Sequence, residues 1–297
     1  TALNGTTGEV YKGKVETKAA EVSGDFAALM DLCNKYTKLN VRTNADTPHD
    51  AEVARAFGAS GIGLCRTEHM FFDAEKIVAM REMILSPDVE GRRKALAKLL
   101  PFQKADFKGI FKAMDGCPVN VRLLDPPLHE FVPHDAKGQE EMAKAMGVTV
   151  QEIKKRVESL CEHNPMLGHR GCRLGNTYPE ITEMQTQAIL GAAIELKKEG
   201  YDPHPEIMVP LTGILYEFEA QEKVIRDAAA ALFEKEGMEI PFKVGTMIEI
   251  PRAALTANRI ASRAEYFSFG TNDLTQMTFG YSRDDIASFL SLIHISE

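Results

Sequence analysis

Short apolar segments alternate with amphipathic stretches along this chain from residue 39 onward. Each apolar segment ends in polar or charged residues, and the stretch that follows has the hydrophobic spacing of a helix. Seven segments follow the pattern: 39–44, 61–66, 119–125, 167–173, 206–211, 243–249 and 266–273. Strands separated by helices pair in parallel through right-handed crossovers. Because so many units in about 250 residues favour a closed barrel over an open sheet, the pattern predicts an α/β fold of the (β/α)8 TIM type, with seven of its eight strands present.

Capping residues support the helices that this pattern predicts. Thr47 followed by Pro48 is typical of an N-cap with proline at the first helical position. Thr149 with Glu152 three residues later predicts a capping box. Pro179 is expected to start a long helix.

The chain divides into three predicted parts. The first is Gly-rich and alternating, and we interpret it as the last strand of a domain that lies upstream. The second is a linker with a short helix, and the third is the barrel, which contains two long helical insertions. The expected boundaries are 1–20 for the strand remnant, 21–38 for the linker and 39–297 for the barrel, with insertions at 74–117 and 129–165.

Composition and charge exclude several classes of function. The chain is 44% hydrophobic and 26% charged, as soluble proteins are. Its formal net charge of -8, without a strongly basic stretch, argues against a nucleic-acid partner. No apolar run approaches the roughly 18 residues that span a membrane, so no membrane partner is expected. The five cysteines are odd in number and widely spaced, which favours a reduced, cytoplasmic chain.

The residues that follow the apolar segments are rich in arginine and carboxylate, and in a β/α barrel these positions carry the chemistry. They are Arg42, Asn44, Arg66, Glu68, His69, Arg122, Asp125, His169, Arg170, Arg173, Glu249, Arg252, Asn272 and Asp273. The planar forks of Arg66, Arg122 and Arg170 suit a phosphate or carboxylate ligand. The alternative is that each arginine forms a structural ion pair with a nearby acid.

Two carboxylates, Glu249 and Asp273, end consecutive predicted strands. Two hard oxygen ligands with waters and a phosphorylated ligand are the usual surroundings of Mg²⁺. The alternative for Asp273 is that it only caps a helix beginning at Leu274. Between these carboxylates, residues 270–272 can present backbone N–H groups at a helix N-terminus, where anions bind.

Four segments closely resemble the phosphoenolpyruvate-binding barrel of the pyruvate, phosphate dikinase family. They are G-L-C-R-T-E-H-M-F-F at 63–72, R-L-L-D-P-P-L-H-E-F at 122–131, G-H-R-G-C-R-L-G at 168–175, and residues 267–285. The resemblance covers nearly the whole chain from Gly5. Related enzymes, phosphoenolpyruvate synthase and the sugar-phosphotransferase enzyme I, share R-T-E and G-T-N-D-L-T-Q. The strings at 122–131 and 168–175 are similar to the dikinase in particular.

The resemblance implies a reaction and a set of ligand-binding residues. The reaction converts ATP, pyruvate and phosphate reversibly to AMP, phosphoenolpyruvate and diphosphate, through a phosphohistidine on a swivelling domain. The implied contacts with pyruvate or phosphoenolpyruvate are Arg66, Arg122, Arg170, Glu249, Gly270, Thr271, Asn272 and Asp273. Among them, Glu249 and Asp273 are also the implied ligands of Mg²⁺, the expected cofactor.

Several parts of the family pattern are not found in this sequence. They are the T-S-H-A motif with the phosphorylated histidine, the ATP-grasp region, and the C-G-E-H-G motif with the cysteine acid. The resemblance therefore implies a fragment without an assigned catalytic residue, inactive alone, whose tail at 287–297 departs from the family. Its expected partners are the phosphohistidine and ATP-grasp domains of a homodimeric parent. The alternatives are a free-standing phosphoenolpyruvate-binding module, or a synthase or enzyme I relative.

Overall fold

The computed structural model describes residues 2–13, 15, 23–161, 164–283 and 286, in two compact units, Thr1–Asn40 and Val41–Glu297. In the first unit, strands β1 (Ala2–Leu3) and β2 (Val10–Tyr11) pair antiparallel, and the predicted linker helix is α1 (Gly24–Tyr36). The expected atypical tail at 287–297 lies outside the described residues, as do residues 16–22 around the expected linker boundary.

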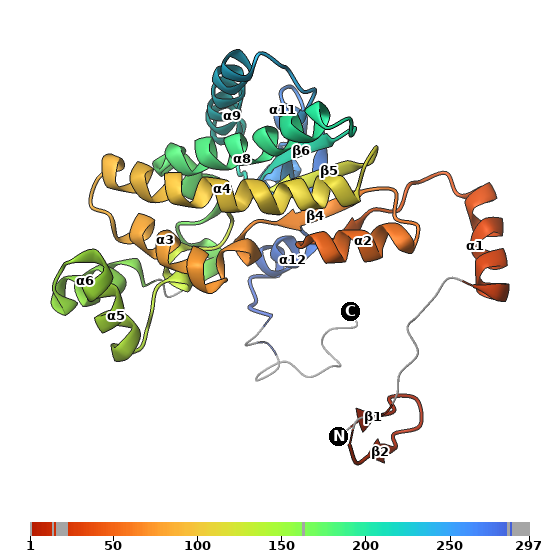
Figure 1. Ribbon diagram of the computed structural model, residues 1–297, viewed down its shortest axis with the longest axis horizontal. Helices are drawn as coiled ribbons and strands as arrows, with labels where there is room; N and C mark the ends of the chain where they lie inside the picture. The colour runs from red at the N-terminus through yellow and green to blue at the C-terminus, as the bar shows by residue number, and fades with distance from the viewer. Residues whose placement is uncertain (1, 14, 16–22, 162–163, 284–285, 287–297) are drawn as a thin grey trace. The chain divides into compact units, whose positions relative to one another are not determined.

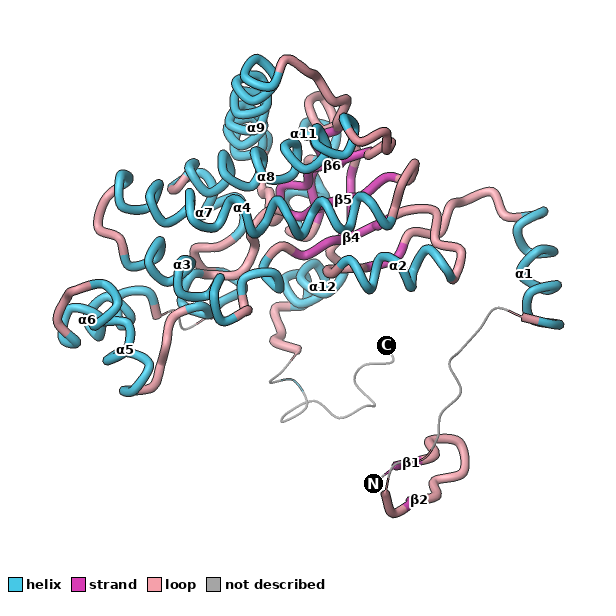
Figure 2. Tube along the Cα trace, viewed as in Figure 1, coloured by secondary structure: helices cyan, strands magenta, loops and turns pink. Residues whose placement is uncertain are grey.

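The second unit is built on a six-stranded parallel sheet (Figures 1 and 2). Its strands are β3 (Thr43–Asn44), β4 (Ile62–Arg66), β5 (Pro118–Arg122), β6 (His204–Val209), β7 (Lys243–Ile248) and β8 (Phe267–Phe269). Neighbouring strands in the sheet are also consecutive in the chain, and every pair is parallel. This order is that of a β/α barrel, because a doubly wound open sheet reverses its strand order at a switch point.

Two side-chain contacts show that the sheet is curled. Tyr266, beside β8, donates from its hydroxyl to Oδ1 of Asn120 on β5 at 2.9 Å. Arg42, beside β3, lies 2.6 Å from Oε2 of Glu206 on β6. Each pair joins strands three positions apart, which would be about 14 Å from each other in a flat sheet. The α/β fold is therefore part of a TIM-type barrel, as the sequence pattern predicted.

Helices cover the outer face of this sheet. Figure 1 shows α4 (Val89–Ala113) and α8 (Pro179–Lys198) side by side across it. Their apolar residues, including Phe107 and Ile189, share one core with strand residues such as Val119 and Ile207. The other helices and 3-10 turns are α2 (Pro48–Ala56), η1 (Glu68–Phe71), α3 (Ala74–Leu85), η2 (Leu128–Phe131), α5 (Ala136–Met146), α6 (Val150–Leu160), η3 (Pro165–Leu167), α7 (Gly171–Thr177), α9 (Leu215–Glu236), α10 (Pro251–Leu255), α11 (Ala257–Ile260) and α12 (Thr271–Phe279).

The predicted helix starts are confirmed. Thr47 is the N-cap of α2 and accepts a hydrogen bond from the backbone of Asp50 at 3.1 Å. Thr149 and Glu152 form the capping box of α6, and α8 begins at Pro179. The predicted insertions are also helical, since 74–117 contains α3 and α4 and 129–165 contains α5 and α6.

One of the seven predicted strands is wrong. Residues 167–173 leave a 3-10 turn, pass through a short loop and begin α7, while β5 pairs directly with β6 in an unbroken register. Gly171 has a φ of +57°, a left-handed conformation that favours glycine and is incompatible with a strand. Its N–H donates to the carbonyl of Asp125 at 2.9 Å, so this segment packs on the loop after β5.

Candidate functional site

A cavity of about 380 Å³ lies at the carboxyl ends of the strands. Every ligand-binding residue predicted from the sequence lines it: Arg66, Arg122, Arg170, Glu249, Gly270, Thr271, Asn272 and Asp273. Further lining residues are Leu64, Glu68, Asp125, Pro126, Pro127, Glu130, Met247 and Phe269. The barrel topology explains this convergence, because the carboxyl ends of parallel strands meet at one edge of the sheet.

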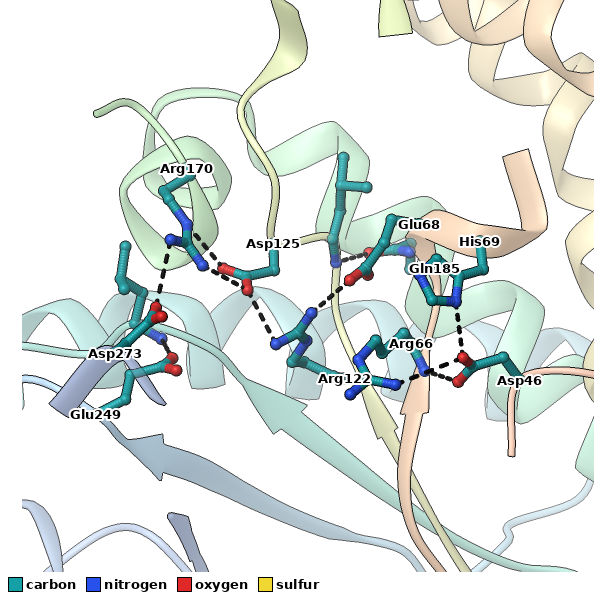
Figure 3. Close-up of polar contacts among 12 residues, drawn as sticks. Asp46, Arg66, Glu68, His69, Arg122, Asp125, Arg170, Gln185, Glu249 and Asp273 are labelled. Carbon is teal, nitrogen blue, oxygen red and sulfur yellow. Dashed lines mark hydrogen bonds and ion pairs between the residues drawn. The ribbon is translucent and has the colours of Figure 1, made fainter. Parts of the chain in front are cut away.

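One carboxylate, that of Asp125, holds two arginines of the cavity (Figure 3). Its Oδ2 lies 2.9 Å from Nη1 of Arg122 and 2.7 Å from Nη2 of Arg170, and its Oδ1 lies 3.3 Å from Nε of Arg170. Asp125 is only 2% exposed. The backbone beside it is fixed by Gln185 of α8, whose Oε1 accepts a hydrogen bond from the N–H of Leu124 at 2.8 Å. Both the β5 end and the α7 start are thereby held around one anion.

The two arginines remain protonated in spite of their burial. Burial alone would lower the pKa of Arg122, but Asp125, Glu68 and Glu249 outweigh this effect and raise it. For Arg170 burial is likewise outweighed, by Asp125, Asp273 and Glu249, so that its pKa is also raised. Arg122 and Arg170 thus both form structural ion pairs, as the alternative interpretation expected, and both also line the cavity.

Some polar atoms at the cavity have no hydrogen-bond partner. Among the described residues, the buried atoms without a partner include Oε2 of Glu68, Nε of Arg122 and Oδ2 of Asp273. Glu68 nevertheless pairs with Arg122 through its other oxygen. Oδ2 of Asp273 lies 3.3 Å from Nη1 of Arg170, which is an ion-pair distance without hydrogen-bond geometry. Since buried polar groups are normally hydrogen-bonded, this cluster has unused capacity for a polar ligand.

Glu249, which follows β7, is held by a strained piece of backbone. The N–H of Leu211 donates to Oε1 of Glu249 at 2.7 Å. Leu211 has a φ of +61°, and it is the one non-glycine residue among those described that has a positive φ. Bulky residues rarely adopt this conformation, which clusters at functional sites. Burial and then Asp125 raise the pKa of Glu249 to about 7, although the Leu211 N–H acts in the opposite direction.

Gly270 allows Glu249 to approach the start of α12. A Cβ atom at Gly270 would lie 2.4 Å from Oε2 of Glu249 and 2.7 Å from its Cβ. The helix begins at Thr271 with Gly270 as its N-cap, so the alternative that Asp273 caps a helix beginning at Leu274 is wrong. Asp273 instead lies in the first turn, and Figure 3 shows its carboxylate beside that of Glu249. Residues 270–273 line the cavity, and the first N–H groups of a helix have no partner within the helix. The N–H of Gly270 is an exception to the sequence prediction, because it donates to the carbonyl of Ile248 at 3.1 Å.

Sequence reasoning noted Glu68 and Asp125 at strand ends without assigning them to the site, and it missed Glu130 and the Leu211 amide. Glu68, Asp125 and Glu130 lie two to eight residues after Arg66 or Arg122, and this short spacing was the sequence signal that could have assigned them to the site. Arg42 was placed with the strand-end residues, but it precedes β3 and pairs with Glu206 instead. No three-residue group of His, Cys, Asp or Glu able to hold a metal occurs in the described part of the chain.

Comparison with known families agrees with this fold. The sequence profile described as "PEP-utilising enzyme, PEP-binding domain" matches residues 20–294. The chain therefore belongs to the family of phosphoenolpyruvate-utilising enzymes and corresponds to their phosphoenolpyruvate-binding domain. In the described residues, no helix is long and apolar enough to cross a membrane.

Its curated relatives include proteins named pyruvate, phosphate dikinase. The protein from Clostridium symbiosum is 57% identical over 97% of this chain and 33% of its own length. The one from Giardia intestinalis is also 57% identical, over 97% of this chain and 33% of its own length. The Oryza sativa subsp. japonica protein is named pyruvate, phosphate dikinase 1, chloroplastic, and is 56% identical over 98% of this chain and 31% of its own length. The chain thus spans about a third of these relatives.

Proposed function

We propose that this cavity binds pyruvate and phosphoenolpyruvate for phosphoryl transfer in a pyruvate, phosphate dikinase. The observation that carries the proposal is the convergence of three arginines, the carboxylates of Glu249 and Asp273 and a helix N-terminus in one cavity. Arg66 and Arg122, with Arg170 as a third, neutralise the phosphoryl oxygens. The amides of Thr271 and Asn272 contact the ligand's anionic groups, with Gly270 beside them, whose own N–H donates to the carbonyl of Ile248 at 3.1 Å.

Mg²⁺ is the cofactor that fits this site, with Glu249 and Asp273 as its protein ligands. The fit rests on hard oxygen donors, one of which, Oδ2 of Asp273, is buried without a hydrogen bond among the described residues. The charge of the cavity also favours a cation, because its five carboxylates outnumber its three arginines. When bound, the metal supplies Lewis-acid stabilisation of the enolate oxygen. Glu249 and Asp273 would have to be ionised to hold it.

The whole reaction needs parts beyond this cavity. We infer that the parent protein converts ATP, pyruvate and phosphate to AMP, phosphoenolpyruvate and diphosphate, as the names of the relatives suggest. Phosphohistidine and ATP-grasp domains are its proposed partners, in a cytoplasmic homodimer. With no catalytic residue assigned in the cavity, we propose that the 297-residue chain alone does not form phosphoenolpyruvate from ATP, pyruvate and phosphate.

Calorimetric titration of the 297-residue chain with phosphoenolpyruvate and Mg²⁺ tests this proposal. Binding by the wild-type chain is expected, and Asp273→Ala should weaken it at least tenfold, which is the usual scale for the loss of a charged contact. Asp227→Ala, on the exposed face of α9, is the matched control. A folded wild-type chain that binds no phosphoenolpyruvate overturns the proposal. A chain that binds it and also acts in a regulatory assay would favour the free-standing module.

A further inference from the structure

Asp46 lies just after β3 and outside the cavity lining, yet it contacts Arg66 twice. Just beyond β3, the N–H of Ala45 donates to the carbonyl of Leu64 on β4 at 3.2 Å. Two residues after Leu64, the N–H of Arg66 donates to Oδ1 of Asp46 at 2.7 Å. The Asp46 side chain therefore continues the β3–β4 ladder by one bond and fixes the backbone from which the Arg66 side chain departs.

The second oxygen of Asp46 faces two side chains (Figure 3). Its Oδ2 lies 3.7 Å from Nη1 of Arg66 and 2.7 Å from Nδ1 of His69. Because a carboxylate only accepts, Nδ1 of His69 carries the hydrogen. The Asp46 side chain is 16% exposed, whereas that of Arg66 is 33% exposed. His69 and the Arg66 guanidinium thus share Oδ2 of Asp46, while Oδ1 accepts the hydrogen bond from the Arg66 N–H.

Arg66 differs from the other two arginines of the cavity. Arg122 and Arg170 each form close contacts with carboxylates, whereas in the described residues the Arg66 guanidinium has only the longer contact with Asp46. Its N–H groups are therefore the most available for a ligand. A long side chain with such freedom loses about 2 kcal/mol of rotamer entropy when a ligand immobilises it, unless a neighbour has already restricted it.

We propose that Asp46, supported by His69, is a positioning residue that aims the Arg66 guanidinium at the phosphoryl group of the ligand. This inference rests on the proposed function of the cavity. Two opposite effects on phosphoenolpyruvate binding allow a decisive test of this inference. Asp46 is an anion close to an anion-binding arginine, so electrostatic repulsion alone predicts that removing its charge strengthens phosphoenolpyruvate binding. Positioning predicts that the same change weakens binding.

A double-mutant cycle on the 297-residue chain tests the inference, with phosphoenolpyruvate and MgCl₂ in a calorimeter. Asp46→Asn keeps the shape and removes the charge, and Asp46→Glu keeps the charge and displaces it. Both are expected to weaken phosphoenolpyruvate binding, on the order of tenfold as for other supporting contacts. In the background of Arg66→Gln, Asp46→Asn should have no further effect, because the residue through which it acts is gone. Asp227→Asn is the matched control.

Pyruvate, which has no phosphoryl group, supplies a second readout. The two Asp46 substitutions are expected to leave pyruvate affinity within about twofold, whereas a general folding defect would weaken both ligands. If Asp46→Asn does not fold, as judged by thermal unfolding, Asp46→Glu carries the test. Unchanged or tighter phosphoenolpyruvate binding by a folded Asp46 variant overturns the inference, as does additivity with Arg66→Gln. If the wild-type chain itself binds no phosphoenolpyruvate, this result contradicts the proposed function of the cavity and not the role of Asp46 in particular.

Discussion

Arg170 and Asp125 form a two-point contact between segments that are distant in the sequence. Nε and Nη2 of the arginine lie 3.3 Å and 2.7 Å from the two carboxylate oxygens. The carbonyl of Asp125 also accepts a hydrogen bond from Gly171, the first residue of α7. The same aspartate therefore fixes the position of a cavity arginine through both its side chain and its backbone.

Replacing Asp125 should destabilise the protein strongly. Asp125→Ala leaves two buried guanidinium groups, those of Arg122 and Arg170, without their shared anion. Removing one partner of a buried ion pair costs about 3–5 kcal/mol in the free energy of unfolding. Urea denaturation followed by circular dichroism measures this change. The control Asp227→Ala, at an exposed site, should change the free energy by about 0.5 kcal/mol or less, and a comparably small loss for Asp125→Ala would contradict the prediction.

The free energy of unfolding should depend on pH through Glu249. Its pKa in the folded chain is about 7, against an ordinary value of 4.5, so the folded state retains this proton when the unfolded state has lost it. The folded state is therefore favoured at low pH, and the free energy falls as pH rises from about 4.5 to about 7, by about 3 kcal/mol at most. Above this range the contribution has been lost.

Comparing the wild type with Glu249→Gln isolates this contribution. Urea denaturation from about pH 5 to about pH 8 should show the variant gaining stability relative to the wild type as pH rises, because glutamine cannot ionise. Glu52→Gln, an exposed substitution on α2, is the matched control. A difference between wild type and Glu249→Gln that stays constant across this range would show that Glu249 does not titrate there.

Gly270→Ala should displace Glu249. The added Cβ would lie 2.4 Å from Oε2 of Glu249 and 3.0 Å from Sδ of Met247, so the carboxylate has to move. Forcing a methyl group into a packed site costs about 1–3 kcal/mol, and we expect Mg²⁺-dependent binding of phosphoenolpyruvate to weaken with it. Calorimetry and urea denaturation measure the two effects. Gly5→Ala, where a Cβ meets no atom within 4 Å, should change neither, and unaltered binding by Gly270→Ala would argue against this crowding.

The curl of the sheet can be tested at Tyr266. Its ring lies 2.6 Å from where a Cβ of Gly245 would be, and its hydroxyl donates to Asn120 across the barrel interior. Gly245→Ala should lower the free energy of unfolding by about 1–3 kcal/mol through overpacking. Tyr266→Phe should lower it by about 1–3 kcal/mol, because it leaves Oδ1 of Asn120 without its donor.

Combining the two substitutions checks this contact. Because the ring and the glycine are neighbours, their effects on the free energy of unfolding should be non-additive. Strict additivity in urea denaturation would mean that the ring does not pack on Gly245. Tyr216→Phe, at a side chain that is 76% exposed, is the matched control and should change the free energy by about 0.5 kcal/mol or less.

The site was predictable to the extent that strand ends were recognisable. Arg66 ends β4 and Arg122 ends β5, so the alternation of apolar and polar segments located both. Arg170 was located for the wrong reason, because it precedes a helix that sequence patterning assigned to a strand. Its presence in the cavity follows from its contacts with Asp125 and Asp273, which no spacing along the chain encodes.

Local periodicity and capping were sufficient to determine the parallel α/β architecture, the helix starts at Pro48 and Pro179, and the edge of the sheet where the charged residues meet. These features depend on neighbours in the sequence, which the chain itself displays. The sharing of Asp125 by two arginines, the left-handed Leu211 amide on Glu249 and the contact of Asp46 with Arg66 were decided by tertiary structure. Each depends on how closely non-local segments approach and which way a backbone group points, and these are set only when the whole barrel packs.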